Sequence, residues 1–144
     1  MTKRILASAF IALLCAAPAQ AADPLASLSY LVGTWSCTYN GGGQHTTYTA
    51  TYDYAWPGGG GDVGLTTYEP KGNTWTEIVA VIERSTTLFR AKGSDGAHRV
   101  YRSVYPSTLM TLIFDRISDA KYTLHFNGTY AGKTMTSYDV CTKQ

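Results

Sequence analysis

The segment LVGTWSCTYN, residues 31–40, decides how we expect the chain to fold. Side chains alternate between the two faces of a strand, so Gly33, Trp35 and Cys37 share one face if this segment is extended. A tryptophan near the start of such a strand can plug one end of a small barrel, and the nearby glycine leaves room for a neighbour. The segment therefore predicts the first strand of a closed sheet and raises the question of which residue pairs with Cys37.

The chain begins with MTKRILASAFIALLCAAPAQA, residues 1–21, which has the form of a secretory signal peptide. A basic start is followed by an apolar run too short to span a membrane and by the small residues Ala-Gln-Ala of a cleavage site. We expect cleavage after Ala21, so that residues 22–144 form a single domain in the periplasm or outside the cell. Cys15 lies within the leader and is removed with it.

The formal charge of the mature chain is close to zero. The full sequence has 12 basic and 10 acidic residues, and two of the basic ones, Lys3 and Arg4, lie in the leader. No run of basic residues remains in the mature part, which argues against binding to nucleic acid or to an anionic membrane surface. We further expect a monomer without a membrane-spanning segment.

Cys37 and Cys141 are the two cysteines of the mature chain. In an oxidising compartment an even count predicts a disulfide, and here a single connectivity is available. The bridge would join the first strand to the last few residues and close a loop of roughly 100 residues, for which the chain-entropy model gives about 4 to 5 kcal/mol. A metal site or a free redox thiol is the alternative, but the sequence has neither the ligand spacing nor the CxxC partner that these require.

Alternation of apolar and polar residues dominates the mature chain, with many Thr and Tyr residues and Gly-rich breaks at short intervals. This pattern is typical of an all-β barrel or sandwich. We predict a lead-in or helical turn at 22–29 and strands at 32–39, 46–56, 62–69, 74–83, 86–92, 98–105, 108–116, 120–127 and 130–141. The expected fold is an antiparallel up-and-down β-barrel of about 8–10 strands.

The connections between these strands predict two unlike ends of the barrel. If every connection is a hairpin, residues 40–45, 70–73, 93–97 and 117–119 share one end. These connections are mostly longer, whereas the other end has the two tightest turns, so we expect one open mouth and one closed end. The parity of the strand count stays open: an odd number makes the first and last strands parallel where they meet, and an even number makes them antiparallel.

The element Gly33-Thr34-Trp35, together with the strand count and the loop rhythm, resembles the calycin-type barrels, which include lipocalins, avidin relatives and nitrobindin-like haem-binding barrels. The segment YDVCTK, residues 138–143, is similar to the last strand of an avidin, in which an aspartate contacts biotin. The resemblance implies a barrel that holds a small hydrophobic or aromatic ligand in its lumen. The chain lacks the Thr-Asp-Tyr motif of lipocalins, and His125 falls on a polar face rather than facing inward as a haem ligand would, so we expect no cofactor.

The candidate ligand-binding residues are aromatic side chains predicted to line the inner face of the barrel. They are Trp35, Tyr48, Tyr52, Tyr54, Trp75 and Tyr101. Three of these tyrosines belong to TTYTATYDYAW, residues 46–56, where rings at alternate positions would point into the lumen. The alternative is that the rings pack across strands in a barrel filled by its own side chains.

Two charged residues lie on the same predicted faces as these rings. Glu77 shares a face with Trp75, but both faces of this strand are partly apolar, so the pattern does not fix which one is inward. An inward orientation would make Glu77 a buried, functional carboxylate, and we expect the outward one. Arg99 shares a face with Tyr101, where it could bind a carboxylate ligand or stack on the barrel wall.

The residue patterns of common enzymes are missing from the sequence. His45, His98 and His125 stand alone without an acid at ligand spacing, so neither a metal nor a haem site is predicted. No G-x-S-x-G element occurs, and GGGG at residues 58–61 precedes a strand rather than a helix. We therefore expect an exported binding protein rather than an enzyme. The alternative is a protein-binding module that acts through the loops NGGGQH and GSDGAHR, since the chain is also similar to small disulfide-bonded periplasmic barrels that inhibit lysozymes or proteases.

Overall fold

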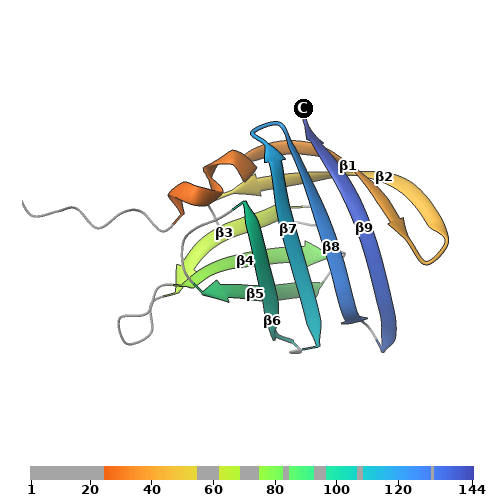
Figure 1. The fold of residues 1–144 in the computed structure, drawn as a ribbon. Coiled ribbons are helices and arrows are strands. Elements are labelled where there is room, and N and C mark those ends of the chain that lie inside the picture. Colours follow the sequence, from red (N-terminus) through yellow and green to blue (C-terminus); the bar gives the residue numbers. More distant parts are fainter. Residues whose placement is uncertain are drawn as a thin grey trace, which may run out of the picture.

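The computed structural model describes residues 25–54, 62–68, 75–82, 85–92, 97–106, 109–130 and 132–144. Within these ranges nine strands close into a barrel, and a short 3₁₀ helix lies at one of its ends (Figure 1). The predicted leader, residues 1–21, lies outside the described residues. No helix in the described part of the chain is long and apolar enough to cross a membrane.

The elements follow one another around the barrel in chain order. They are the helix η1 (Ala26–Leu31) and the strands β1 (Gly33–Gly41), β2 (Gln44–Asp53), β3 (Asp62–Tyr68), β4 (Trp75–Ile82), β5 (Ser85–Lys92), β6 (His98–Tyr105), β7 (Met110–Ser118), β8 (Lys121–Tyr130) and β9 (Lys133–Lys143). The all-β barrel and each of its predicted strands are confirmed, with strand ends that differ from the predicted ones by a few residues. The lead-in forms η1, which starts and ends later than the predicted turn.

Alternating burial identifies the inner face of the barrel. On β6 the side chains of Arg99, Tyr101 and Ser103 are buried, whereas those of their neighbours along the strand are exposed. The same alternation places Trp35 and Cys37 of β1 inside. Because side chains at directly paired positions of adjacent strands share a face, these residues fix the inner face of the strands beside them.

The strands pair antiparallel with a single exception among the described residues. β2 and β3 run parallel, with Thr51 opposite Asp62 and Asp53 opposite Gly64. This parallel step reverses the direction of all later strands, so β1 and β9 are antiparallel although the strand count is odd. The step also explains why a barrel of nine strands can close without a second parallel pair.

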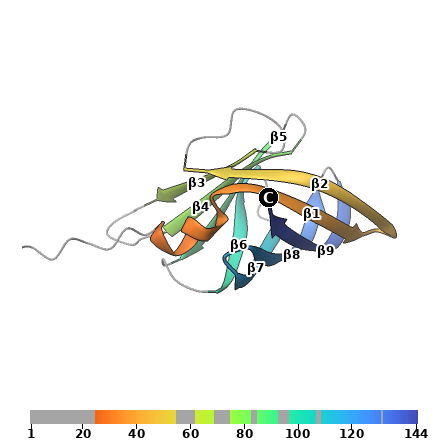
Figure 2. The same ribbon diagram turned by 90° about the horizontal axis from the view of Figure 1, so that it is seen from above.

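We call the end of the barrel at η1 the η1 end and the opposite end the far end (Figures 1 and 2). The hairpin between β1 and β2 lies at the far end, where β4, β6 and β8 also end. The strands on either side of residues 70–73, 93–97 and 117–119 meet at the η1 end instead. The prediction that 40–45 shares an end with these three connections is therefore wrong, because it assumed a hairpin between β2 and β3.

The predicted disulfide joins the first strand to the last. Cys37 and Cys141 are direct register partners on β1 and β9, with Cα atoms 4.0 Å apart and a sequence separation of 104. Neither residue is exposed to solvent. The bridge thus links the two ends of the chain inside the closed wall of the barrel, and it fits folding in an oxidising environment.

The helix η1 closes its end of the core through apolar contacts and one hydrogen bond. Leu28 and Leu31 of η1 are 2% and 0% exposed and belong to the same core cluster as Trp35. The indole Nε1 of Trp35 donates to the carbonyl oxygen of Leu31 at 2.6 Å. The tryptophan therefore fills the end of the barrel where the first strand begins, as its place in the sequence predicted.

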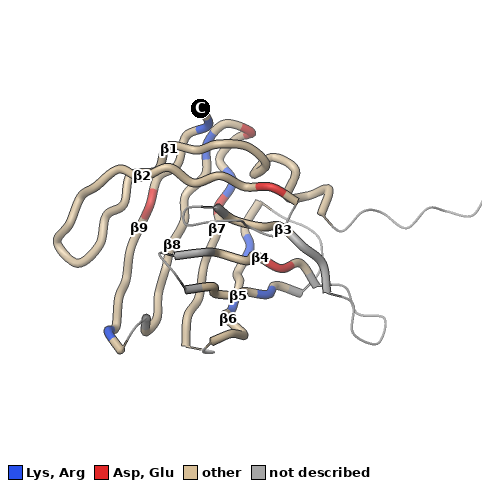
Figure 3. The backbone as a smooth tube through the Cα atoms, turned by 180° about the vertical axis from the view of Figure 1, so that it is seen from behind, with Lys and Arg blue, Asp and Glu red and all other residues tan. Residues whose placement is uncertain are grey.

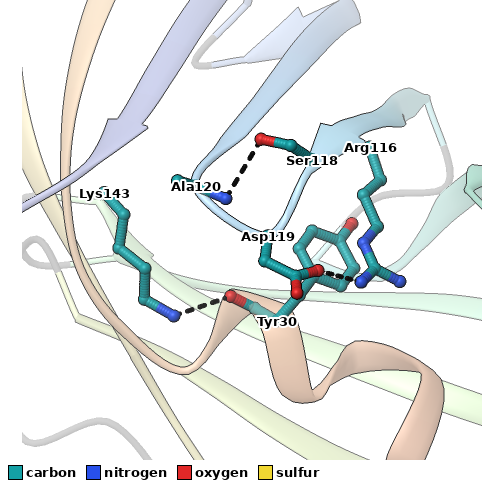
Figure 4. Close-up of polar contacts among 6 residues, drawn as sticks. All are labelled: Tyr30, Arg116, Ser118, Asp119, Ala120 and Lys143. Atoms are coloured by element: carbon teal, nitrogen blue, oxygen red, sulfur yellow. Dashed lines mark hydrogen bonds and ion pairs between the residues drawn. The ribbon is translucent and has the colours of Figure 1, made fainter.

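Two basic residues hold Tyr30 of η1 from opposite sides (Figure 4). Lys143 Nζ donates to the Tyr30 carbonyl oxygen at 3.0 Å and also lies 5.4 Å from the centre of the Trp35 ring. The guanidinium of Arg116 lies 4.6 Å from the centre of the Tyr30 ring and pairs with Asp119 in the turn between β7 and β8. These contacts tie η1 to the C-terminal strand and to the β7–β8 turn.

The Lys143→Met variant is expected to lower the free energy of unfolding by about 1 kcal/mol, since it loses one hydrogen bond and one cation–π contact but keeps its aliphatic stem. Urea denaturation followed by tryptophan fluorescence measures the change. The matched control is Lys133→Met, at the exposed start of the same strand, where we expect no comparable loss. Equal effects of the two substitutions would show that the contact with η1 adds nothing to stability.

Candidate functional site

Aromatic side chains fill the η1 half of the barrel. Trp35, Tyr52, Tyr101, Phe114 and Tyr122 are each at most 4% exposed. The ring of Tyr122 lies 4.7 Å from that of Trp35, 6.1 Å from that of Tyr52 and 5.6 Å from that of Phe114, measured between centroids. Tyr101 packs edge-on against Phe114 at 5.8 Å. This half is therefore a packed core, which corresponds to the alternative of a barrel filled by its own side chains.

The hydroxyl groups of this core are paired within it. Tyr52 and Tyr122 share a hydrogen bond with 2.9 Å between their oxygens, and the Tyr122 oxygen lies 3.6 Å from Cys37 Sγ. Pairing of this kind satisfies polar groups that have left water, so it stabilises one arrangement of the rings.

A buried arginine, Arg99, belongs to a second set of hydrogen-bonded side chains. Arg99 on β6 is 5% exposed, and its Nη1 donates to Thr76 Oγ1 at 2.9 Å. The Thr76 hydroxyl in turn shares a 2.9 Å hydrogen bond with the hydroxyl of Tyr101. These contacts give Arg99 a structural role, because its Nη1 is held by Thr76 of β4 across the inner face of β5.

Burial raises the pKa of the core tyrosines. The pKa of Tyr30 rises from 10.0 to about 12 because its ring is desolvated. Desolvation also raises the pKa of Tyr52, Tyr101 and Tyr122, and the shared hydrogen bond offsets part of the rise at Tyr52. All of these groups hold their protons more tightly in the folded chain than in the unfolded one.

Alkaline pH is therefore expected to destabilise the fold. A folded-state pKa above the unfolded value gives stability that is complete below the unfolded pKa and is lost as pH rises through the folded pKa. For Tyr30 this window runs from 10.0 to about 12, and the other buried tyrosines extend it upward. Ultraviolet absorbance of tyrosinate and far-ultraviolet circular dichroism should change together above the start of this window. Ionisation of every tyrosine near the unperturbed pKa with the fold intact would contradict the assignment.

A different polar pair lies farther toward the far end. The Tyr48 hydroxyl on β2 donates to Asp139 Oδ2 on β9 at 2.7 Å. Because β1 lies between β2 and β9, this hydrogen bond passes over the inner face of β1. Asp139 is 4% exposed, whereas 37% of Tyr48 is exposed. The pair therefore joins a buried carboxylate to a ring that solvent reaches.

Apolar side chains on β8 are also open to solvent on this inner face. Leu124 is the register partner of Asp139, and Phe126 follows it two positions along the strand. Both pack against the core but are only partly buried, although Tyr122 on the same face is fully buried. The interior is thus closed at η1 and becomes accessible toward the far end. The end at Trp35 is closed as predicted, but the predicted open mouth at the longer connections 70–73, 93–97 and 117–119 is wrong, because the strands on either side of them meet at the closed η1 end.

The six predicted ligand-binding residues fall into separate places. Trp35, Tyr52 and Tyr101 belong to the packed core of the η1 half, and Tyr48 lies apart beside Asp139. Tyr54 lies just beyond the end of β2 and is 46% exposed. Trp75 begins β4, but its side chain lies outside the described residues.

Charged residues are sparse along the strands (Figure 3). Glu77 of β4 alternates with the inward Thr76, so it faces outward, where it pairs with Arg90 of β5 and is 7% exposed. His98 Nδ1 lies 2.5 Å from Asp115 Oδ1 at an exposed position. In the described ranges no three His, Cys, Asp or Glu side chains gather closely enough to hold a metal ion.

The fold defines the class of protein as a small closed β-barrel with one disulfide, an architecture that suits a binding role. No protein-family model matches the chain, and no curated protein is significantly similar to it. The resemblance to calycin-type barrels therefore stays a prediction.

Proposed function

We propose that this protein binds a small hydrophobic or aromatic ligand inside its barrel. The ligand enters the barrel from the far end. The observation that carries the proposal is the change in accessibility along the inner face, from the fully buried Tyr122 to the partly exposed Leu124 and Phe126 and the 37% exposed Tyr48. Inward apolar and aromatic side chains that remain in contact with water are what a concave ligand site presents before it is filled. The packed rings at η1 form the floor of such a site.

Native mass spectrometry of the protein purified from its own host tests this proposal, with a co-purified small molecule as the expected result. A titration with an environment-sensitive apolar dye supplies a second measurement. Leu124→Trp fills the inner face and should weaken dye binding, whereas Asn127→Trp, on the exposed outer face of the same strand, should not. Absence of a co-purified ligand together with equal dye binding by both variants would contradict the proposal.

The proposal includes export to the periplasm or the extracellular space. The predicted leader and the buried Cys37–Cys141 bridge both support an oxidising compartment. The intact mass of the protein from its host should correspond to a chain that begins at Ala22 and has lost the two thiol hydrogens. A reduced, uncleaved chain would contradict export.

A second candidate function is binding to another protein, as an inhibitor of a lysozyme or protease would. The observation that favours it is the edge of β2: residues 44–50 pair with β1, but within the described ranges they have no strand on their other side. Residues 44–49 are also exposed, and an open edge of this kind can accept a strand from a partner. Stoichiometric inhibition of a lysozyme or a protease by the purified protein would favour this candidate over the small-ligand site.

A further inference from the structure

Asp139 is an acidic residue on the inner face of the barrel. It shares its face of β9 with Ser137 and Cys141, which are 5% and 0% exposed, and is itself 4% exposed. It is the only acidic residue of β9 (Figure 3). A carboxylate in such a place has lost most of its hydration, which costs free energy unless charged or hydrogen-bonding groups replace the water.

The contacts of Asp139 replace that water only in part. Oδ2 accepts the hydrogen bond from Tyr48, but Oδ1 is buried and has no hydrogen-bond partner in the described part of the chain. No lysine or arginine among the described residues forms an ion pair with this carboxylate. Desolvation raises the pKa of Asp139, and the hydroxyls of Tyr48 and Ser137 and the Asn40 backbone N–H offset part of that rise.

We infer that Asp139 recognises the protonated amine of a small aromatic ligand, an inference that rests on the ligand-binding function proposed above. A cation is the group that relieves a buried carboxylate most, because an ammonium supplies both a compensating charge and hydrogen-bond donors. A neutral ligand of the same shape supplies neither charge nor an ammonium, and a carboxylate ligand would add a second negative charge to the site.

Tyr48 determines how such a ligand reaches the carboxylate. Its ring is 37% exposed and is joined to Asp139 by the hydroxyl, so it covers the acid from the solvent side. The ammonium takes the place of the Tyr48 hydroxyl at Asp139, and the displaced ring offers a face for cation–π contact. The partly exposed Leu124, opposite Asp139 in the register, contacts the apolar part of the ligand.

Calorimetric titration with benzylamine, benzyl alcohol and benzoate tests the inference, since the three probes share a ring and differ in charge. Benzylamine, which is protonated at neutral pH as lysine is, should bind at least about tenfold more tightly than benzyl alcohol, and benzoate should bind most weakly. Equal binding of the amine and the alcohol, or no binding of the amine, would overturn the inference.

Two substitutions at the same hydrogen bond sharpen the test. Asp139→Asn should abolish the preference for benzylamine over benzyl alcohol, because the amide carries no charge. Tyr48→Phe should keep that preference and strengthen amine binding, because the ligand no longer competes with the Tyr48 hydroxyl. A preference that survives in Asp139→Asn, or that is lost in Tyr48→Phe, would contradict the assignment.

The pH dependence of the unmodified protein gives a measurement that needs no variant to fold. The titratable side chains that act on Asp139 are Tyr48 from β2 and His125 from β8, and the histidine favours the charged carboxylate. Benzylamine affinity should fall as the pH drops through the raised pKa of Asp139, while benzyl alcohol affinity stays constant. Dye binding without any amine preference would end this inference and leave the proposed function intact, whereas loss of both would end both.

Discussion

Reduction of the Cys37–Cys141 bridge is expected to lower the free energy of unfolding by about 4 kcal/mol. The two cysteines are 104 residues apart, and both are fully buried. Opening a loop of this length restores to the unfolded chain the conformational freedom that the bridge had removed, which the chain-entropy model places at about 4 to 5 kcal/mol. Single domains have a free energy of unfolding of only about 5–15 kcal/mol, so the reduced protein should retain little of its stability.

Urea denaturation of the oxidised protein, the reduced protein and the Cys37→Ala/Cys141→Ala double variant measures this effect. The double variant separates the loss of the bridge from the chemistry of free thiols. β1 and β9 still pair through their backbones, so we expect the barrel to form in all three samples at low denaturant. A difference below about 1 kcal/mol would show that the unfolded chain keeps these two segments close together even without the bridge.

The Trp35→Ala substitution is expected to be the most damaging single replacement, with a loss of about 3–5 kcal/mol. Trp35 is 0% exposed and contacts η1, the Tyr122 ring and Lys143. Truncation leaves a cavity at the point where helix and barrel meet and also removes the hydrogen bond to the Leu31 carbonyl. Thermal and urea unfolding of the purified variant check the prediction.

Two control substitutions divide this loss into its parts. Trp35→Phe keeps an aromatic ring and loses the indole N–H, so it should cost about 1 kcal/mol for the hydrogen bond plus a smaller packing loss. Tyr105→Ala removes an aromatic side chain that is 59% exposed, and we expect its effect to stay within about 0.5 kcal/mol. An effect of Trp35→Ala as small as that of Tyr105→Ala would refute the view that the tryptophan plugs the barrel.

The strands and the disulfide could be predicted because both depend on local patterns. On β6 the structure buries Arg99, Tyr101 and Ser103 and exposes the residues between them, so burial follows the two-residue period of a strand. Cys37 had Cys141 as its only possible partner after removal of the leader, so spacing and parity were not needed. Period-two alternation is a property of the strand itself and does not depend on which strand lies beside it.

The parallel step between β2 and β3 could not be predicted for the opposite reason. The connection PGGGG has the same turn-forming composition whether the chain turns back or continues in the same direction. The direction of β3 is set by long-range pairing, Thr51 with Asp62, which no local pattern specifies. Because β3 was predicted to run antiparallel to β2, every later connection was assigned to the wrong end of the barrel relative to the β1–β2 hairpin.

The aspartate of the candidate site could have been found from the sequence. Cys141 must face inward to reach Cys37, and alternation then places Asp139 on the same face two positions earlier. The similarity of residues 138–143 to the last strand of an avidin, in which an aspartate contacts biotin, already pointed to this residue, but the predicted site contained only aromatic side chains. For Tyr54 the alternation was extended too far. The predicted strand continued to residue 56, whereas β2 ends at Asp53, so Tyr54 no longer follows the alternation of the strand.

The pairing of β1 with β9 also constrains the order in which the molecule can assemble. A polypeptide synthesised from its amino terminus presents β1 first, yet β9, one of the two strands that pair with β1, is the last of the described strands to emerge. The backbone N–H of Gln144, directly after β9, donates to the carbonyl oxygen of Thr34 at 3.0 Å, so the seam between β1 and β9 continues past the strand. Closure of the barrel therefore has to follow synthesis of β9, and a chain that lacks this strand leaves β1 as an unprotected edge available for aggregation.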